Sequence, residues 1–346
     1  MILYTRLAAM TENIKFVPLS LVPVASNPIR IAEEVAMFDN LFPGRIEVGF
    51  ARGYQSRWLQ TLAQDDCITS NVPASDARNR EIYDEYVQII KLAWTRDSFA
   101  FDGKHFQVPY PYQGITGYPA AHVAGEIGAP GETDDGVVIN KVGVIPSPAT
   151  KPHPPLWIPF SFSPATLLNA ATNGYRVLVP GSKPDFFRDF CQTYQRRAAE
   201  GGVQVELGQN ICPLRDIIVS DSRDEALELA NTGASNAMFE YFQYFGMLEQ
   251  WRMPEDDPTK PVTLTSREAI TQRMIDQGYI IIGTVDEVAE QIADLRSCHG
   301  AGGNVEYLAW YCGLQGTVPT EVTVRQLERL AGEVMPKLGR STTARP

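Results

Sequence analysis

Cysteine and histidine are scarce in this sequence, and neither is arranged as a disulfide framework or a metal site requires. The 346 residues include five cysteines and four histidines, scattered along the chain without a C-x-x-C pair. Regular ligand spacing is typical of structural metal sites, and paired cysteines are typical of small secreted domains. We therefore expect reduced thiols, a cytoplasmic location and no metal.

Long apolar runs and an excess of positive charge are also missing. No apolar run reaches the roughly 18 residues of a membrane span. The opening segment MILYTRLAAMTENIKF lacks the basic start and apolar core of a signal peptide. The formal net charge is −11, which disfavours nucleic acid and anionic membranes as partners. With 44% hydrophobic and 21% charged residues, the composition is that of a globular protein with a sizeable core.

Strand and helix patterns alternate along the chain. This alternation is typical of an α/β protein whose parallel sheet is connected by crossover helices. The predicted strands cover residues 14–22, 45–50, 156–160, 175–179, 210–219 and 305–311.

Residues 27–54 predict a helix, a turn and a strand that ends at an arginine. Asn27 is a good helix N-cap, and Pro28 suits the first helical position. Apolar and polar residues alternate over 45–50, as a strand requires. Arg52 follows this strand, and the carboxyl ends of parallel strands are where α/β folds bind ligands. The alternative is an arginine that is merely solvated at a strand end.

A candidate anion site follows the strand predicted over 156–160. Ser163 occupies the N-cap of the next helix, Pro164 its first position and Thr166 its third. Free N–H groups and the dipole at a helix start favour an anion such as phosphate. The alternative is that Ser163 only caps the helix.

Two stretches interrupt the alternation. Residues 107–150 are rich in glycine and proline and have little periodicity, so we expect a long loop, which at such a length is usually functional or disordered. Residues 234–260 are aromatic, and we expect them to be helical before Pro254. This second stretch either packs on the exterior of the fold or lines an apolar substrate pocket.

Four segments together resemble the bacterial luciferase-like flavin-dependent monooxygenases, and they occur in that family's order. The segments are NPIRIAEEVAMFDNLFPGRIEVGFARGY at 27–54, GKHF at 103–106, KPHPPLWIPFSFSPATLLNAATNG at 151–174 and GTVDEVAEQIADL at 283–295. The resemblance implies a TIM-type (β/α)8 barrel. It predicts one domain over 1–340, with insertions at 107–150 and 234–260 and a flexible tail at 341–346. The insertion at 107–150 would cover the mouth of the barrel.

The resemblance also implies roles for individual residues. Arg52, Ser163 and Thr166 match the family's contacts with the flavin phosphate. Pro18 and Leu19 match the place that lies against the isoalloxazine ring, often through an unusual peptide bond; the alternative is a plain core strand. The histidines of the matched segments, His105 and His153, look structural, so the catalytic residues stay unassigned.

The family pattern begins before this chain does. Met1 falls inside what should be the second helix, and about six strands are predicted instead of eight. We therefore expect an incomplete barrel, in which the strands at 14–22 and 305–311 each lack one partner.

The resemblance implies a monooxygenase that uses reduced FMN and O₂ and depends on a separate flavin reductase. The aromatic segment 234–260 indicates a small apolar substrate, and we expect a homo-oligomer. One alternative is an F420-dependent oxidoreductase that transfers hydride. The other is a non-catalytic flavin-binding protein or an inactive fragment.

Overall fold

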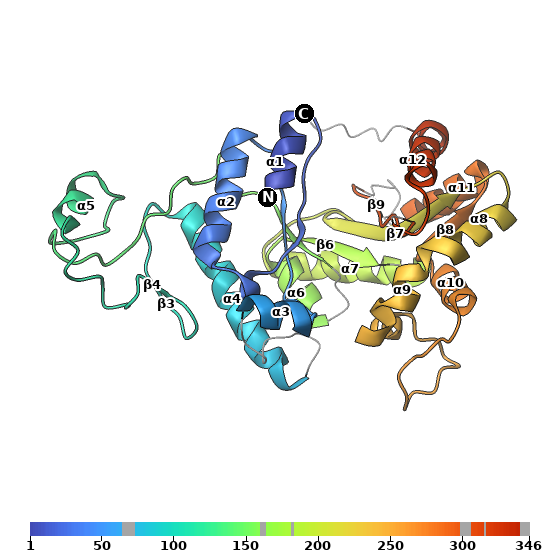
Figure 1. Cartoon of the computed structure of the whole chain (residues 1–346), viewed down its shortest axis with the longest axis horizontal. Coiled ribbons are helices and arrows are strands. Elements are labelled where there is room, and N and C mark those ends of the chain that lie inside the picture. The colour runs from blue at the N-terminus through green and yellow to red at the C-terminus, as the bar shows by residue number, and fades with distance from the viewer. Residues whose placement is uncertain (64–72, 160–163, 181–182, 298–305, 315, 340–346) are drawn as a thin grey trace. The chain divides into compact units, whose positions relative to one another are not determined.

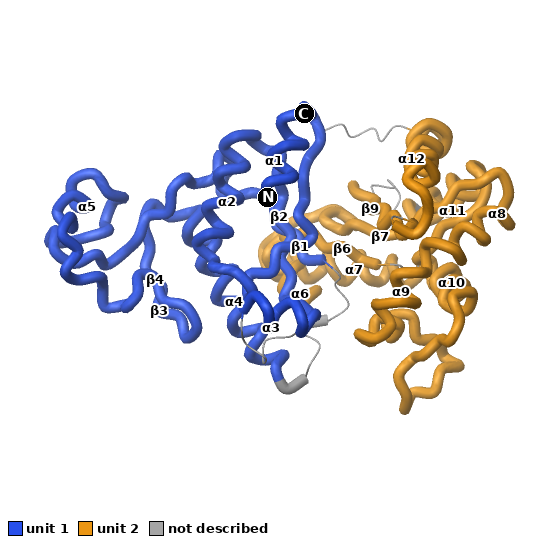
Figure 2. The backbone as a smooth tube through the Cα atoms, in the orientation of Figure 1, with its two compact units in different colours: residues 1–159 blue, residues 160–346 orange. Residues whose placement is uncertain are grey.

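The computed structural model describes residues 1–63, 73–159, 164–180, 183–297, 306–314 and 316–339. The predicted tail at 341–346 therefore lies outside the described residues, as do Ser163 and all of 298–305. The chain forms two compact units, Met1–Pro159 and Phe160–Pro346 (Figure 2). Each unit is described by itself below.

The first unit is built from short strands and longer helices (Figure 1). Its elements are α1 (Ile2–Ala9), β1 (Leu19–Leu21), a 3-10 turn (Pro23–Ala25), α2 (Pro28–Leu41), β2 (Val48–Phe50), α3 (Ser56–Ala63), α4 (Pro73–Thr95), β3 (Phe101–Asp102), β4 (Gln107–Val108), α5 (Ala121–Ile127) and β5 (Leu156–Ile158). Strands β1, β2 and β5 pair in parallel, with β2 in the middle.

Local sequence explains how α2 and β2 form. Asn27 caps α2, because its side chain accepts hydrogen bonds from the N–H groups of Ile29 and Arg30. The helix ends before the Pro43-Gly44 turn, and all three residues of β2 are buried. Glycine at position 49 lets β1 approach β2 closely, since a Cβ there would meet the Leu19 side chain at 2.5 Å.

Helices α2 and α4 form the apolar core of this unit against the strands. Trp94 of α4 is fully buried, and its indole N–H donates to the carbonyl oxygen of Ala32 on α2 at 3.0 Å. Its ring stacks near that of Phe50 on β2, with centroids 6.3 Å apart. Burying one large side chain of this kind stabilises a fold by roughly 2–3 kcal/mol, so the helix pair fixes the end of β2 firmly.

The insertion at 107–150 is more ordered than the sequence predicts. It carries β4 and α5. One antiparallel bridge joins Phe99, ahead of the insertion, to Val142, and a second joins Ile115 to Ile139. Its return is anchored on α2, where the Asp39 carboxylate accepts the N–H of Thr150 at 2.6 Å. In Figure 2 the insertion lies on the side of α2 and α4 away from β1 and β2. Whether the insertion covers a barrel mouth stays a prediction.

The second unit continues the strand–helix alternation. Its elements are α6 (Pro164–Thr172), β6 (Arg176–Pro180), α7 (Pro184–Glu200), β7 (Ile211–Val219), α8 (Arg223–Leu229), a π-helical turn (Ala230–Ala234), α9 (Asn236–Glu240), 3-10 turns (Phe242–Phe245, Met247–Trp251), α10 (Arg267–Asp276), β8 (Ile280–Gly283), α11 (Val285–Ser297), β9 (Ala309–Trp310), α12 (Thr320–Arg329), a π-helical turn (Leu330–Val334) and a 3-10 turn (Met335–Leu338). Every residue of β7 is buried, and β7 pairs in parallel with β6, β8 and β9.

The predicted strands omit β8, and this is a correction. Its four residues, Ile280–Gly283, are all buried, so they form a continuous apolar run without the alternation of a half-exposed strand. The described parts of the two units together hold seven parallel strands, close to the predicted number of about six. Within those parts, β1 pairs only with β2 and β9 only with β7, as predicted for the strands at 14–22 and 305–311.

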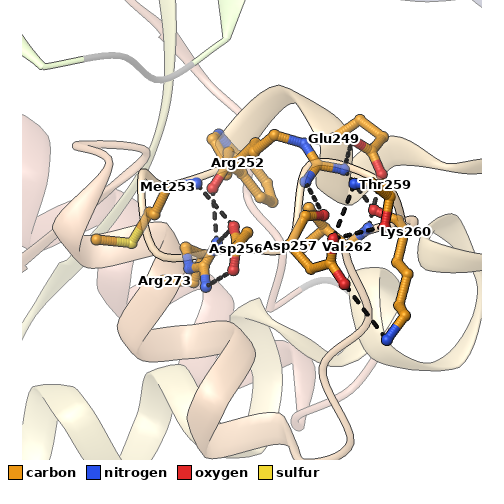
Figure 3. Close-up of polar contacts among 10 residues, drawn as sticks. Glu249, Arg252, Met253, Asp256, Asp257, Thr259, Lys260, Val262 and Arg273 are labelled. Carbon is orange, nitrogen blue, oxygen red and sulfur yellow. Dashed lines mark hydrogen bonds and ion pairs between the residues drawn. The ribbon is translucent and has the colours of Figure 1, made fainter.

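The aromatic stretch 234–260 is helical before Pro254, as predicted. Trp251 is buried, with its ring 5.0 Å from that of Tyr279. Figure 3 shows that polar contacts close the loop that follows. Arg252 donates to the Glu249 carboxylate and to the Lys260 carbonyl oxygen, at 2.7 Å each. These contacts hold the loop to the body of the unit.

None of the helices in the described part of the chain combines the length and the apolar character that a bilayer span requires.

Candidate functional site

Arg52 lies just beyond the carboxyl end of β2. Its guanidinium Nη1 donates to Oδ1 of Asp76 at 2.5 Å, and its side chain is 22% exposed. Its backbone carbonyl oxygen accepts a hydrogen bond from Asn79 Nδ2 at 2.8 Å. The next residue, Gly53, has a φ of +80°, a conformation that favours glycine. Arg52 is therefore held both at the tip of its side chain and at its backbone carbonyl group.

The contacts with Arg52 come from one face of α4. Asp76, Asn79, Arg80 and Tyr83 recur at helical spacing, so their side chains share a face. Asn79 is fully buried, and the Tyr83 hydroxyl donates to the carbonyl oxygen of Phe50 at 3.4 Å. Sequence reasoning did not name Asp76 or Asn79, although this run of polar residues at helical spacing was the available signal.

The charges around Arg52 are nearly balanced. Asp76 also lies 3.7 Å from Arg80, so one carboxylate faces two guanidinium groups. Burial raises the pKa of the nearby Asp84 carboxyl, and the positive charges of Arg80 and Arg52 oppose that rise. Two arginines thus share two acidic side chains, of which one favours its neutral form more than an exposed aspartate does.

Pro18 and Leu19 lie beside β2, on the same pair of strands that leads to Arg52. Pro18 is buried, whereas Leu19 is 43% exposed. Leu19 is in register with Gly49, and the N–H of Ala51 donates to the Leu21 carbonyl oxygen at 2.9 Å. The Leu19–Ser20 peptide bond is cis, at the place where the resemblance implies an unusual peptide bond.

Thr166 lies in the first turn of α6 and is half-buried. Ser163 lies outside the described residues. Thr166 belongs to the second unit and Arg52 to the first, so their joint role in one phosphate site stays a prediction.

The second unit contains a buried carboxylate that sequence reasoning missed. Asp216 on β7 accepts hydrogen bonds from the Trp310 indole at 2.9 Å and from the N–H of Gly313 at 3.0 Å. Burial nevertheless raises the pKa of Asp216 to about 6. The carboxylate ties β7 to the turn after β9. A partner 94 residues away leaves no local signal in the sequence.

The two histidines of the matched segments have structural surroundings. The backbone N–H of His105 donates to Glu85, and its ring lies 3.3 Å from Glu81. His153 is half-buried, and burial lowers the pKa of its imidazole. Neither contact indicates acid–base catalysis. Among the described residues, no group of three His, Cys, Asp or Glu side chains could hold a metal ion.

Parallel strands joined by helices, with an arginine beyond the carboxyl end of β2 and an exposed apolar side chain on the neighbouring β1, are typical of an α/β ligand-binding class. Residues 1–301 match the family described as luciferase-like monooxygenase, and the chain belongs to this family. The predicted family and its TIM-type barrel class are confirmed.

Two relatives of known activity span nearly all of this chain. The oxygenase component of a flavin-dependent trigonelline monooxygenase from Acinetobacter baylyi is 24% identical over 343 residues, which is 98% of this chain and 80% of that protein. The 3,6-diketocamphane 1,6-monooxygenase of Pseudomonas putida is 21% identical over 340 residues, which is 96% of this chain and 82% of that protein. The relatives agree with the predicted enzyme class, a flavin-dependent monooxygenase.

Solved structures show the same fold. The oxygenating constituent of 3,6-diketocamphane monooxygenase, in complex with FMN, has a TM-score of 0.69 and 20% identity, and covers 97% of this chain and 83% of that chain. An F420-dependent secondary alcohol dehydrogenase has a TM-score of 0.59 and 13% identity, with the same two coverages. At these identities the likeness supports the fold alone.

Proposed function

We propose that this chain is the oxygenase component of an FMN-dependent monooxygenase. The observation that carries the proposal is Arg52, held at the carboxyl end of β2 with part of its side chain exposed. The similarity to a relative named as an oxygenase component supports a separate reductase that supplies reduced FMN. A cytoplasmic location and a homo-oligomeric state remain predictions.

The residues of the first unit fit a phosphorylated flavin. Arg52 already contacts an oxyanion, the Asp76 carboxylate, and a guanidinium suits bidentate contact with phosphate. The exposed Leu19 beside β2 offers an apolar surface to an aromatic ring. Reduced flavin supplies the reaction with O₂. The chain would hold the phosphate through Arg52, Ser163 and Thr166, orient the ring on Pro18 and Leu19, and exclude water.

The aromatic segment of the second unit supports a small apolar substrate. The rings of Phe242 and Phe245 lie 5.3 and 5.0 Å from that of Tyr241. Tyr244 is 77% exposed. Aromatic side chains of this kind bind apolar compounds through large contact areas. The role of this cluster as a pocket lining remains part of the proposal.

An F420-dependent hydride transfer is the second candidate, because an F420-dependent dehydrogenase shares the fold. Titrating the purified chain with FMN, riboflavin and F420 separates the two candidates. We expect FMN to bind more tightly than both riboflavin and F420. Tight binding of F420 with weak binding of FMN would favour the hydride-transfer enzyme. Binding of none of them would contradict both proposals.

A further inference from the structure

We propose that Asp76 is a positioning residue that orients the Arg52 guanidinium for the cofactor phosphate. Asp76 holds Nη1 and leaves the edge formed by Nε and Nη2 to the phosphate. This inference rests on the proposed FMN function and adds a residue to its binding site.

The contact between the two side chains is one-sided. Nη1 of Arg52 donates to Oδ1 of Asp76 at 2.5 Å. Among the described residues, Nε and Nη2 of Arg52 have no hydrogen-bond partner, and part of the side chain is exposed. A guanidinium binds phosphate best through two parallel N–H groups, and that edge of Arg52 is available.

Both ends of Arg52 are fixed by the same face of α4. Asn79 is fully buried and holds the Arg52 carbonyl oxygen, while Asp76, one turn earlier, holds the tip of the side chain. An arginine that is ordered before binding loses less side-chain entropy when the phosphate arrives. Asp76 therefore contributes by orientation rather than by touching the phosphate.

The negative charge of Asp76 is shared with a second cation. Arg80 lies 3.7 Å from Oδ2, the oxygen that does not contact Arg52. This neighbour weakens the repulsion that a phosphate near Arg52 meets from the carboxylate. The rival view is that Asp76 competes with the phosphate for Arg52, and it predicts an effect of opposite sign.

Substitutions at Asp76 distinguish the two views when FMN and riboflavin are titrated in parallel. Asp76→Ala should weaken FMN binding roughly three- to tenfold, the cost of ordering one long side chain on binding, and should leave riboflavin binding within about twofold. Asp76→Asn should lie closer to the wild type, because its amide oxygen still accepts from Nη1. Asp84→Asn is the matched control, since it removes a carboxylate from the same cluster and should not weaken FMN binding.

Each other outcome overturns the proposal. Tighter FMN binding by Asp76→Ala would make Asp76 a competitor, and equal loss for both flavins would indicate damage to the fold, which thermal melting would also reveal. Unchanged FMN binding would remove any role for Asp76. If wild-type protein binds FMN no better than riboflavin, the proposed phosphate site is wrong. If wild-type protein prefers FMN but substitutions at Asp76 have no effect, only the role of Asp76 is wrong.

Discussion

Arg52 is the residue on which the proposed phosphate site depends most. Its loss removes a charged partner of the phosphate, which costs roughly 1.5–3 kcal/mol, or about tenfold to over a hundredfold in affinity. We therefore predict that Arg52→Ala weakens FMN binding by this factor and weakens riboflavin binding much less. Arg52→Lys should recover part of the loss, because it keeps the charge but not the planar fork. If Arg52→Ala weakened the binding of FMN and of riboflavin equally, Arg52 would not contact the phosphate.

Asp216 should make the stability of the second unit depend on pH. Its pKa is raised by burial from 3.8 to about 6, so between these pH values the folded state binds more protons than the unfolded state. The free energy of unfolding should therefore fall as the pH rises through this window. At about 1.4 kcal/mol for each pKa unit, the fall amounts to roughly 3 kcal/mol. Denaturant unfolding from pH 4 to 7 measures the free energy of unfolding of wild type and of Asp216→Asn. The value for wild type minus that for the variant should fall as the pH rises.

Asp256 provides a control of opposite sign. The hydrogen bond from Arg273 lowers the pKa of Asp256 to about 2, so its contribution is present above pH 3.8 and is lost as the pH falls toward 2. The difference between wild type and Asp256→Asn should therefore grow with pH. A difference for Asp216→Asn that also grows with pH would contradict the raised pKa.

Sequence reasoning named Arg52 because its signal is local, a strand pattern followed directly by an arginine. It did not name Asp76 or Asp216, because their partners lie 24 and 94 residues away and only the fold brings them together. Contacts between distant segments therefore limit how much of a site a single sequence predicts.

At the scale of elements, the approach of β1 to β2 depends on Gly49. A Cβ at this position would lie 2.5 Å from Leu19 Cδ2 and 2.8 Å from the Pro18 carbonyl oxygen. We predict that Gly49→Ala costs about 1–3 kcal/mol of stability, as overpacked sites do, measured by denaturant unfolding. Gly332→Ala is the control, since an added Cβ there meets nothing within 4 Å and alanine suits a helical position better. Equal stability of the Gly49→Ala variant and wild type would contradict the close approach.

The insertion at 107–150 gives a second prediction at this scale. It is anchored on α2 and, within the first unit, lies on the side of α2 and α4 away from β1 and β2 (Figure 2). Its exposed apolar residues include Tyr110 at 81% and Ile145 at 82% exposure. Limited proteolysis should cut it at the same rate with and without saturating FMN. Protection by FMN would instead support the predicted cover over the barrel mouth.

Sequence patterns predicted most elements but not all of them. Helix α2 carries its own cap and turn signals, and apolar and polar residues alternate over 45–50 around β2, so both were predictable. Strand β8 lacks alternation because all four of its residues are buried. The glycines and prolines of 107–150 concealed α5, a short helix whose Gly125 lies next to Thr133 and Gly136 of the same insertion.

At the scale of the whole molecule, the family could be predicted because its segments recur in order over most of the chain. The match over residues 1–301 bears this out. The choice between FMN and F420 depends on few contacts in a shared fold, so neither the pattern nor the fold determines it.

The most direct test of the central claim is the reaction of reduced FMN with O₂ in the presence of this chain. Reduced FMN would be mixed anaerobically with excess protein and then with O₂, while flavin absorbance is followed. We expect reduced FMN in the presence of the protein to reoxidise with a time course that differs from that of free FMN, and Arg52→Ala at the same concentration to change it much less. Reoxidation identical to that of free FMN at every protein concentration would contradict the account.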